Sequence, residues 1–177
     1  MKKKVNYINN KTLYGAMIQH KNEVQQALLD NKSKPQVPRY IGESIILICN
    51  NLAKKPNFSG YTYKDDMIGD AMIDCIAAVK NFNPDKTSNP FAYFTQIAWN
   101  AFIRRIYKEK KQTYIKHKNF ENLYLMDELF SGESNIQLGT NEYSNDVVKS
   151  YEIKLTKPKK TSKLSGIVKF SENEDEK

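Results

Sequence analysis

The sequence has few of the residues that build catalytic and metal centres. Its 177 residues include two histidines, two cysteines and seven glycines, and neither histidine has a partner at metal-ligand spacing. No glycine-rich loop has the spacing of a phosphate-binding motif. Cys49 and Cys75 each lie in an apolar run, which favours buried free thiols over a disulfide. These features argue against a metal site, a cofactor and an enzyme.

Long apolar runs are also missing. No stretch approaches the roughly 18 apolar residues that a membrane-spanning helix needs, and the mean hydropathy is -0.68. The basic start MKKKVNYINN lacks the apolar stretch and cleavage site of a secretory signal. We therefore expect a cytosolic protein without a membrane partner.

Positive charge, in contrast, is abundant. Twenty-eight Lys and Arg against 20 Asp and Glu give a formal net charge of +8. Such a surplus favours polyanionic partners, and nucleic acid ranks first among them. With 40% hydrophobic residues, the chain can form one compact domain with polar flanks.

The spacing of apolar residues predicts an all-α fold, because no strand-like alternation persists long enough to form a sheet. Asn89 and Pro90 have the form of an N-cap followed by a first-turn proline. Asn9 or Asn10 can cap the first helix. The four predicted helices cover residues 9–29, 41–54, 65–81 and 90–111. In the third, one apolar stripe is expected to contain Ile68, Met72, Cys75, Ile76 and Val79.

The periodic pattern weakens after residue 118. The run FENLYLMDELF predicts a short helix, residues 131–145 are polar and aperiodic, and a lysine-rich stretch precedes the acidic SENEDEK. Charge-biased segments of this kind are typical of solvated tails that become ordered on a partner. We expect a helical domain over 1–118, a connecting segment over 119–163 and a hydrophobic-acidic tail over 164–177.

The helix predicted over 90–111 carries more large apolar side chains than one buried stripe holds. One interpretation is a helix buried on both sides within a small bundle. The other is that some rings face nucleobases, because residues 104–118 add two Arg and five Lys against one Glu. Single-stranded nucleic acid binds such rings by stacking and such cations through phosphates. One side holds Phe91, Phe94, Ala98, Ala101, Phe102 and Ile106, and outside it lie Tyr93, Trp99, Ile103 and Tyr107.

Three carboxylates line one side of the helix predicted over 65–81. Asp66, Asp70 and Asp74 are spaced four residues apart, which places them in a row. The row could hold a divalent metal for a nuclease, remain solvated, or dock a basic partner. We rank the metal-dependent nuclease last. Asp65 and Asp66 also suit the positive end of the helix dipole.

The run DDMIGDAMIDCIAAVKNFNPDKTSNPFAYFTQIAWNAFIRRI resembles the second conserved region of bacterial sigma factors. The similarity lies in an acidic helix, then AVKNFNPDK, then PFAYFTQIAW in an aromatic-rich helix. With KPNFSGYT just upstream, the chain looks like the late-transcription sigma factors of T-even-type bacteriophages. The resemblance is clearest over residues 41–111, so the expected domain over 1–118 would be sigma region 2-like.

The resemblance implies that the two helices have different partners. The acidic helix would dock on the clamp coiled coil of the host RNA polymerase core. The aromatic helix would capture the non-template strand of the near promoter element, with a flipped adenine held by Phe94 or, after a one-residue slip, by Tyr93. The implied polymerase-binding residues are Asp66, Gly69, Asp70, Met72 and Ile76. The implied DNA-binding residues are Lys86, Phe91, Tyr93, Phe94, Ile97, Trp99, Asn100, Arg104, Arg105 and Lys108.

The chain also departs from housekeeping sigma factors. Ile97 and Ala98 occupy the places of their paired tryptophans, and Trp99 is displaced by one residue. No helix pair after residue 118 resembles their domain for an upstream promoter element, so help is expected through the C-terminus. The alternative is a charged tail with isolated hydrophobic residues. The residues implied to bind the polymerase flap and the phage sliding clamp are Leu164, Ile167, Val168 and Phe170.

The sequence therefore predicts a non-enzymatic late sigma factor in the cytoplasm of an infected bacterial host. It would direct the host polymerase to late promoters and help melt them, with a sliding clamp and a coactivator as further partners. The alternative is a stand-alone protein that binds single-stranded nucleic acid. That alternative does not explain the row of carboxylates at Asp66, Asp70 and Asp74.

Overall fold

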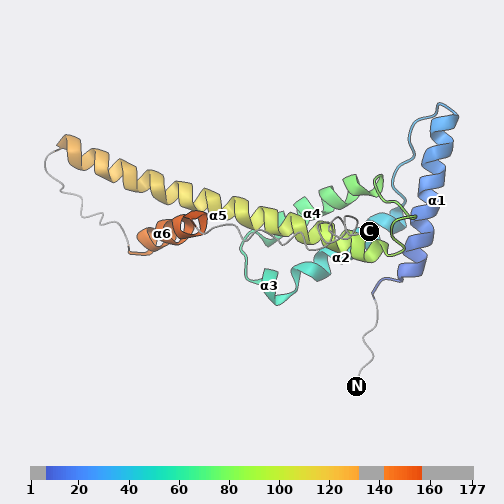
Figure 1. Cartoon of the computed structure of the whole chain (residues 1–177), viewed down its shortest axis with the longest axis horizontal. Coiled ribbons are helices and arrows are strands. Elements are labelled where there is room, and N and C mark those ends of the chain that lie inside the picture. Colours follow the sequence, from blue (N-terminus) through green and yellow to red (C-terminus); the bar gives the residue numbers. More distant parts are fainter. Residues whose placement is uncertain (1–6, 132–141, 157–177) are drawn as a thin grey trace, which may run out of the picture. The chain divides into compact units, whose positions relative to one another are not determined.

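The computed structural model describes residues 7–131 and 142–156, and every regular element in these ranges is an α-helix (Figure 1). This confirms the predicted all-α class. The chain divides into two compact units, Met1–Glu109 and Lys110–Lys177. The predicted tail residues Leu164, Ile167, Val168 and Phe170 lie outside the described ranges. The helices are α1 (Asn10–Leu29), α2 (Arg39–Ala53), α3 (Pro56–Ser59), α4 (Lys64–Val79), α5 (Pro90–Ser131) and α6 (Glu142–Thr156).

Asparagine side chains cap the starts of α1 and α5. Asn9 Oδ1 accepts hydrogen bonds from the backbone N–H groups of Lys11 at 3.0 Å and Thr12 at 3.4 Å. Asn89 Oδ1 accepts one from Ala92 N at 3.0 Å. Pro90 follows as the first residue of α5, where its missing N–H would have no helical partner in any case. Both helix starts are as predicted.

The first unit has one apolar core, to which α1, α2, α4 and α5 all contribute. Cys49 and Cys75 are both fully buried and free, as predicted. The hydrogen bond with Cys49 and burial raise the pKa of the Cys75 thiol, which stays protonated and donates to Phe94 O at 3.6 Å. Buried residues include Leu13 and Met17 of α1, Ile41, Ile45 and Ile48 of α2, Met67, Ala71, Cys75 and Val79 of α4, and Phe94, Ala98, Ala101, Phe102 and Ile106 of α5.

The buried stripe of α4 differs from the predicted one. It follows Met67, Ala71, Cys75 and Val79 at steps of four, so Ile76 lies about 100° away from Cys75 around the helix. Ile76 is consequently 49% exposed, and its predicted place in the apolar stripe is wrong. Ile68 and Met72 are half-buried at the margin of the core.

The second unit contains α6 and the part of α5 after residue 109. The rings of Tyr114 and Tyr151 stack with centroids 4.5 Å apart, and the Tyr114 hydroxyl donates to Glu152 Oε1 at 3.2 Å. His117 Nδ1 lies 2.8 Å from Ser144 Oγ. None of the helices within residues 7–131 and 142–156 is long and apolar enough to cross a membrane.

Two expectations about this half of the chain are wrong. The fourth helix was expected to stop at residue 111, with a separate short helix later, but α5 is continuous to Ser131. No glycine or proline interrupts residues 91–131, so nothing in the sequence forces an end. The segment over 131–145 was expected to be aperiodic, yet α6 begins within it at Glu142.

Candidate functional site

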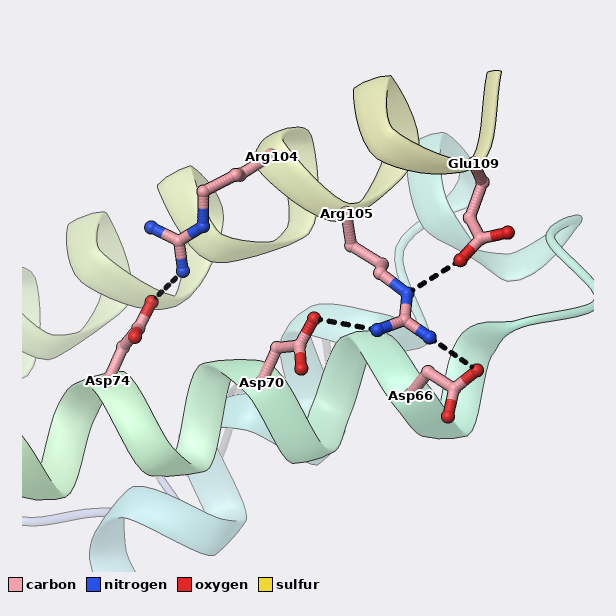
Figure 2. Close-up of polar contacts among 6 residues, drawn as sticks. All are labelled: Asp66, Asp70, Asp74, Arg104, Arg105 and Glu109. Atoms are coloured by element: carbon pink, nitrogen blue, oxygen red, sulfur yellow. Dashed lines mark hydrogen bonds and ion pairs between the residues drawn. The ribbon is translucent and has the colours of Figure 1, made fainter. Parts of the chain in front are cut away.

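Opposite charges face each other across α4 and α5 of the first unit (Figure 2). The carboxylates come from the predicted row of aspartates on α4, and the guanidinium groups come from consecutive arginines of α5. Arg104 pairs with Asp74. Arg105 pairs with Asp66 and Asp70. We call this set, together with Glu109 of α5, the ion-pair row.

Arg105 is the centre of the ion-pair row. Its Nη2 lies 2.8 Å from Asp66 Oδ2, its Nη1 3.2 Å from Asp70 Oδ2 and its Nε 2.9 Å from Glu109 Oε1. The side chain is only 17% exposed. Burial opposes its charged form, but the three carboxylates outweigh burial and raise the pKa of the guanidinium. The expected phosphate-binding role of Arg105 therefore requires it to leave these carboxylates.

Arg104 is more accessible than Arg105. Its side chain is 64% exposed and pairs with the single carboxylate of Asp74. Across the part of the chain that the structure describes, no group of three or more His, Cys, Asp or Glu is arranged to hold a metal ion. The carboxylates of α4 instead face guanidinium groups, which neutralise them.

The solvent side of α4 combines acid with exposed isoleucine. The side chain of Asp66 is 59% exposed, and Ile76 is 49% exposed. Gly69 and Met72, also expected to contact polymerase, are half-buried. Ile73 is not among the residues expected from the sequence, although it is 68% exposed and lies one turn before Ile76. The sequence could have indicated this exposure, because Ile73 lies outside the predicted apolar stripe.

Phe94 lies in the core and not at the surface. Its side chain is 0% exposed, and its ring packs at right angles to that of Tyr93, with centroids 5.2 Å apart. A ring without exposed surface offers no face to a base in this conformation. Phe94 could hold a flipped adenine only if its ring left the core.

Tyr93 is half-buried, so it is more accessible than Phe94. The ring packs against Phe82 with centroids 5.3 Å apart, and the hydroxyl donates to Ala78 O at 3.1 Å near the end of α4. Burial raises the pKa of Tyr93. The hydroxyl therefore stays protonated as a donor.

The surplus of aromatic residues on α5 is explained in part by packing. Trp99 is half-buried, with its ring 4.8 Å from that of Phe58 in α3. Phe91 is half-buried and its ring lies 5.8 Å from that of Tyr7. Tyr107, in contrast, is 69% exposed. Burial on more than one side thus accounts for most of these rings.

Comparison with known families adds one decisive observation. Residues 52–112 match the family model Sigma-70 region 2. This segment is a sigma-70 region 2 domain. It contains the ion-pair row and every residue between 66 and 108 that was expected to contact polymerase or DNA. Region 2 domains bind the RNA polymerase core and promoter DNA, and sigma factors are non-catalytic. No curated protein matches the chain.

The region 2 domain also has a groove between the end of α4 and the first half of α5. This α4–α5 groove has a volume of about 450 Å³. Lys80 and Asn81 were not predicted from the sequence, although they directly follow the AV of the recognised pattern. Two other predicted cations, Lys86 and Lys108, are exposed. The polar and predicted residues that line the groove are Asp74, Lys80, Asn81, Ile97, Asn100 and Arg104.

Proposed function

We propose that this chain is a late sigma factor of the T-even phage type. It directs the RNA polymerase core of an infected bacterial host to late promoters and helps melt the near promoter element. The match of residues 52–112 to sigma-70 region 2 carries the proposal, because it joins the acidic α4 and the aromatic α5 in one domain. The phage type rests on the resemblance that includes KPNFSGYT. The factor acts in the host cytoplasm and needs no catalytic residue or cofactor.

The polymerase-binding step uses the solvent side of α4. Asp66 offers a largely exposed carboxylate, and Ile73 and Ile76 offer apolar contact beside it. A basic surface such as the clamp coiled coil complements this combination, since opposite charges orient the encounter and apolar burial holds it. Asp70 is 38% exposed and can accept a further cation while it remains near Arg105.

The DNA-binding step uses one face of α5. Tyr93, Ile97, Asn100 and Arg104 follow one another at steps of three or four residues, so they share that face. Three of them line the α4–α5 groove. With Phe94 in the core, Tyr93 becomes the residue proposed to stack on the extruded base. Stacking and phosphate contacts then offset the few kcal/mol needed to unpair and unstack a base.

Promoter opening tests this proposal directly. We expect the wild-type protein with host core polymerase to open an AT-rich late promoter, measured by permanganate reactivity of unpaired thymines. Tyr93→Ala should lower the reactivity about tenfold, because one base–ring stack is lost. Tyr93→Phe should retain opening, since it keeps the ring and loses only the bond to Ala78.

The matched control is Tyr107→Ala, which removes an equally large ring from an exposed position of α5. It should open the promoter normally. Normal opening by Tyr93→Ala bound to polymerase would exclude Tyr93 as the stacking residue. No opening by the wild-type protein with any candidate host core would reject the proposed function itself.

The proposed role of the C-terminal tail concerns residues outside the described ranges. Leu164, Ile167, Val168 and Phe170 combine apolar side chains with the acidic run that follows them. We expect them to bind the polymerase flap and the phage sliding clamp, with a coactivator as a further partner. Deletion after Ser162 should spare basal transcription and remove stimulation by a DNA-loaded clamp. Equal stimulation of the truncated protein would discard this role.

A further inference from the structure

A second hollow in the first unit shares only Ile76, Ala77 and Lys80 with the surfaces assigned above. It is lined by α1, by the segment between α1 and α2, and by the end of α4, and its volume is about 400 Å³. That size falls within the range of ligand-binding cavities. Neither α1 nor the segment after it belongs to the residues that match sigma-70 region 2. The hollow therefore needs its own explanation.

A buried histidine without a partner lies in the wall of this hollow. His20 is only 7% exposed, and its Nδ1 has no hydrogen-bond partner in the structure. Buried polar atoms are nearly always hydrogen-bonded, so an isolated one calls for a partner that is not part of the chain. Nδ1 donates to an oxygen when the ring carries its proton there.

The charges around the hollow are all of one sign. Lys21, Lys34 and Lys80 contribute to the lining, and no aspartate or glutamate does. No ion pair joins these lysines to a carboxylate of residues 7–131 or 142–156. We call the site the lysine-rimmed hollow. Its charge favours an anionic ligand.

The remaining lining distinguishes a peptide from a nucleic acid. It is largely aliphatic and includes Met17, Val24 and Val37. The nearby aromatic residue, Phe82, is 4% exposed, and its ring packs against Tyr14 and Tyr93. A base would need an exposed ring face to stack on, whereas an aliphatic side chain fits this surface.

We propose that the lysine-rimmed hollow binds an acidic peptide segment of a protein partner. An aliphatic side chain of the peptide lies against Met17, Val24 and Val37. Its neighbouring carboxylates pair with the lysines, and the peptide lies against the wall that contains His20. This interaction shares Lys80 with the α4–α5 groove and Ile76 with the proposed polymerase-binding surface, and its other contacts come from α1 and the segment between α1 and α2.

The test uses the full chain and a fluorescein-labelled peptide that alternates glutamate with leucine. Fluorescence anisotropy should show saturable binding. The double variant Lys21→Gln with Lys34→Gln should weaken it at least about fivefold, and neither lysine lines the α4–α5 groove. The double variant Lys54→Gln with Lys111→Gln removes the same charge from exposed positions that are not part of the hollow's lining, and it should leave the affinity near the wild-type value. A peptide with glutamine in place of glutamate should bind at least about fivefold more weakly.

The two histidines supply a readout in the same sample. Proton NMR of the imidazole rings should show that the peptide shifts the Cε1–H signal of His20 and leaves that of His117 unchanged, since His20 lines the hollow and His117 does not. Equal weakening by the two double variants, or an unmoved His20 signal, would overturn the proposal. Displacement of the peptide by oligothymidylate with the same shift at His20 would overturn it in favour of nucleic acid.

Discussion

Phe94→Ala is expected to lower the free energy of unfolding of the first unit by about 3–5 kcal/mol, the usual cost of deleting a buried phenylalanine ring. Phe94 is fully buried, and its ring packs against that of Tyr93. The cavity left behind adds to the lost transfer free energy because a packed core relaxes only in part. Urea unfolding followed by far-ultraviolet circular dichroism measures the effect. Loss of promoter opening in this variant would then report instability and not a missing base contact.

Phe94→Leu separates the two roles of this position. Leucine keeps an apolar side chain of similar bulk, so the variant should be more stable than the alanine variant. It has no aromatic face, however. If Phe94 acts only in the core, the leucine variant should open promoters like the wild type. A stable Phe94→Leu protein that binds polymerase and fails to open DNA would show that the ring leaves the core to hold a base.

Asp70→Lys is expected to weaken association with the RNA polymerase core by at least about tenfold. The change reverses charge in the middle of the acidic row, where a basic partner would bind. It also places a lysine beside Arg105, whose Nη1 lies 3.2 Å from Asp70 Oδ2. Association is measured by co-purification and by fluorescence anisotropy with labelled protein. The thermal transition of each variant shows whether the domain remains folded.

Asp74→Lys is the matched control for this experiment. Asp74 lies one turn later on the same helix and pairs with Arg104, but it is not among the residues expected to contact polymerase. Because Arg104 is more exposed than Arg105, Asp74→Lys should perturb the fold no more than Asp70→Lys, and it should bind polymerase better. Equal polymerase binding by both variants and the wild type would favour the stand-alone nucleic-acid-binding alternative. In that case the carboxylates would only stabilise the domain through their ion pairs.

Local patterns in the sequence predicted most of the first unit. The capping asparagines Asn9 and Asn89 marked helix starts, and the buried side of α5 followed from its period. The same period grouped Phe94 with Ala98, Ala101, Phe102 and Ile106, which are all buried, while the sigma-factor resemblance gave Phe94 a base to hold. The structure shows Phe94 buried together with these residues, because the apolar side chains of this chain determine which side of α5 faces the core.

Other features depend on contacts that spacing cannot specify. The row formed by Asp66, Asp70 and Asp74 was predicted, but its pairing with Arg104 and Arg105 depends on how α4 and α5 are rotated against each other. The helix α6 was missed because a periodic signal needs several buried positions. Only Ser144 and Val148 of α6 are buried.

The ion-pair row makes the two proposed ligands thermodynamically linked. Arg105 can bind a DNA phosphate only if its ion pairs with Asp66 and Asp70 break. A cation of the polymerase that pairs with those two carboxylates would lower the free-energy cost of breaking them. Each ligand would then raise the affinity for the other by the same factor, since coupling between sites is reciprocal. A protein built in this way would avoid DNA on its own and acquire affinity for it on the enzyme.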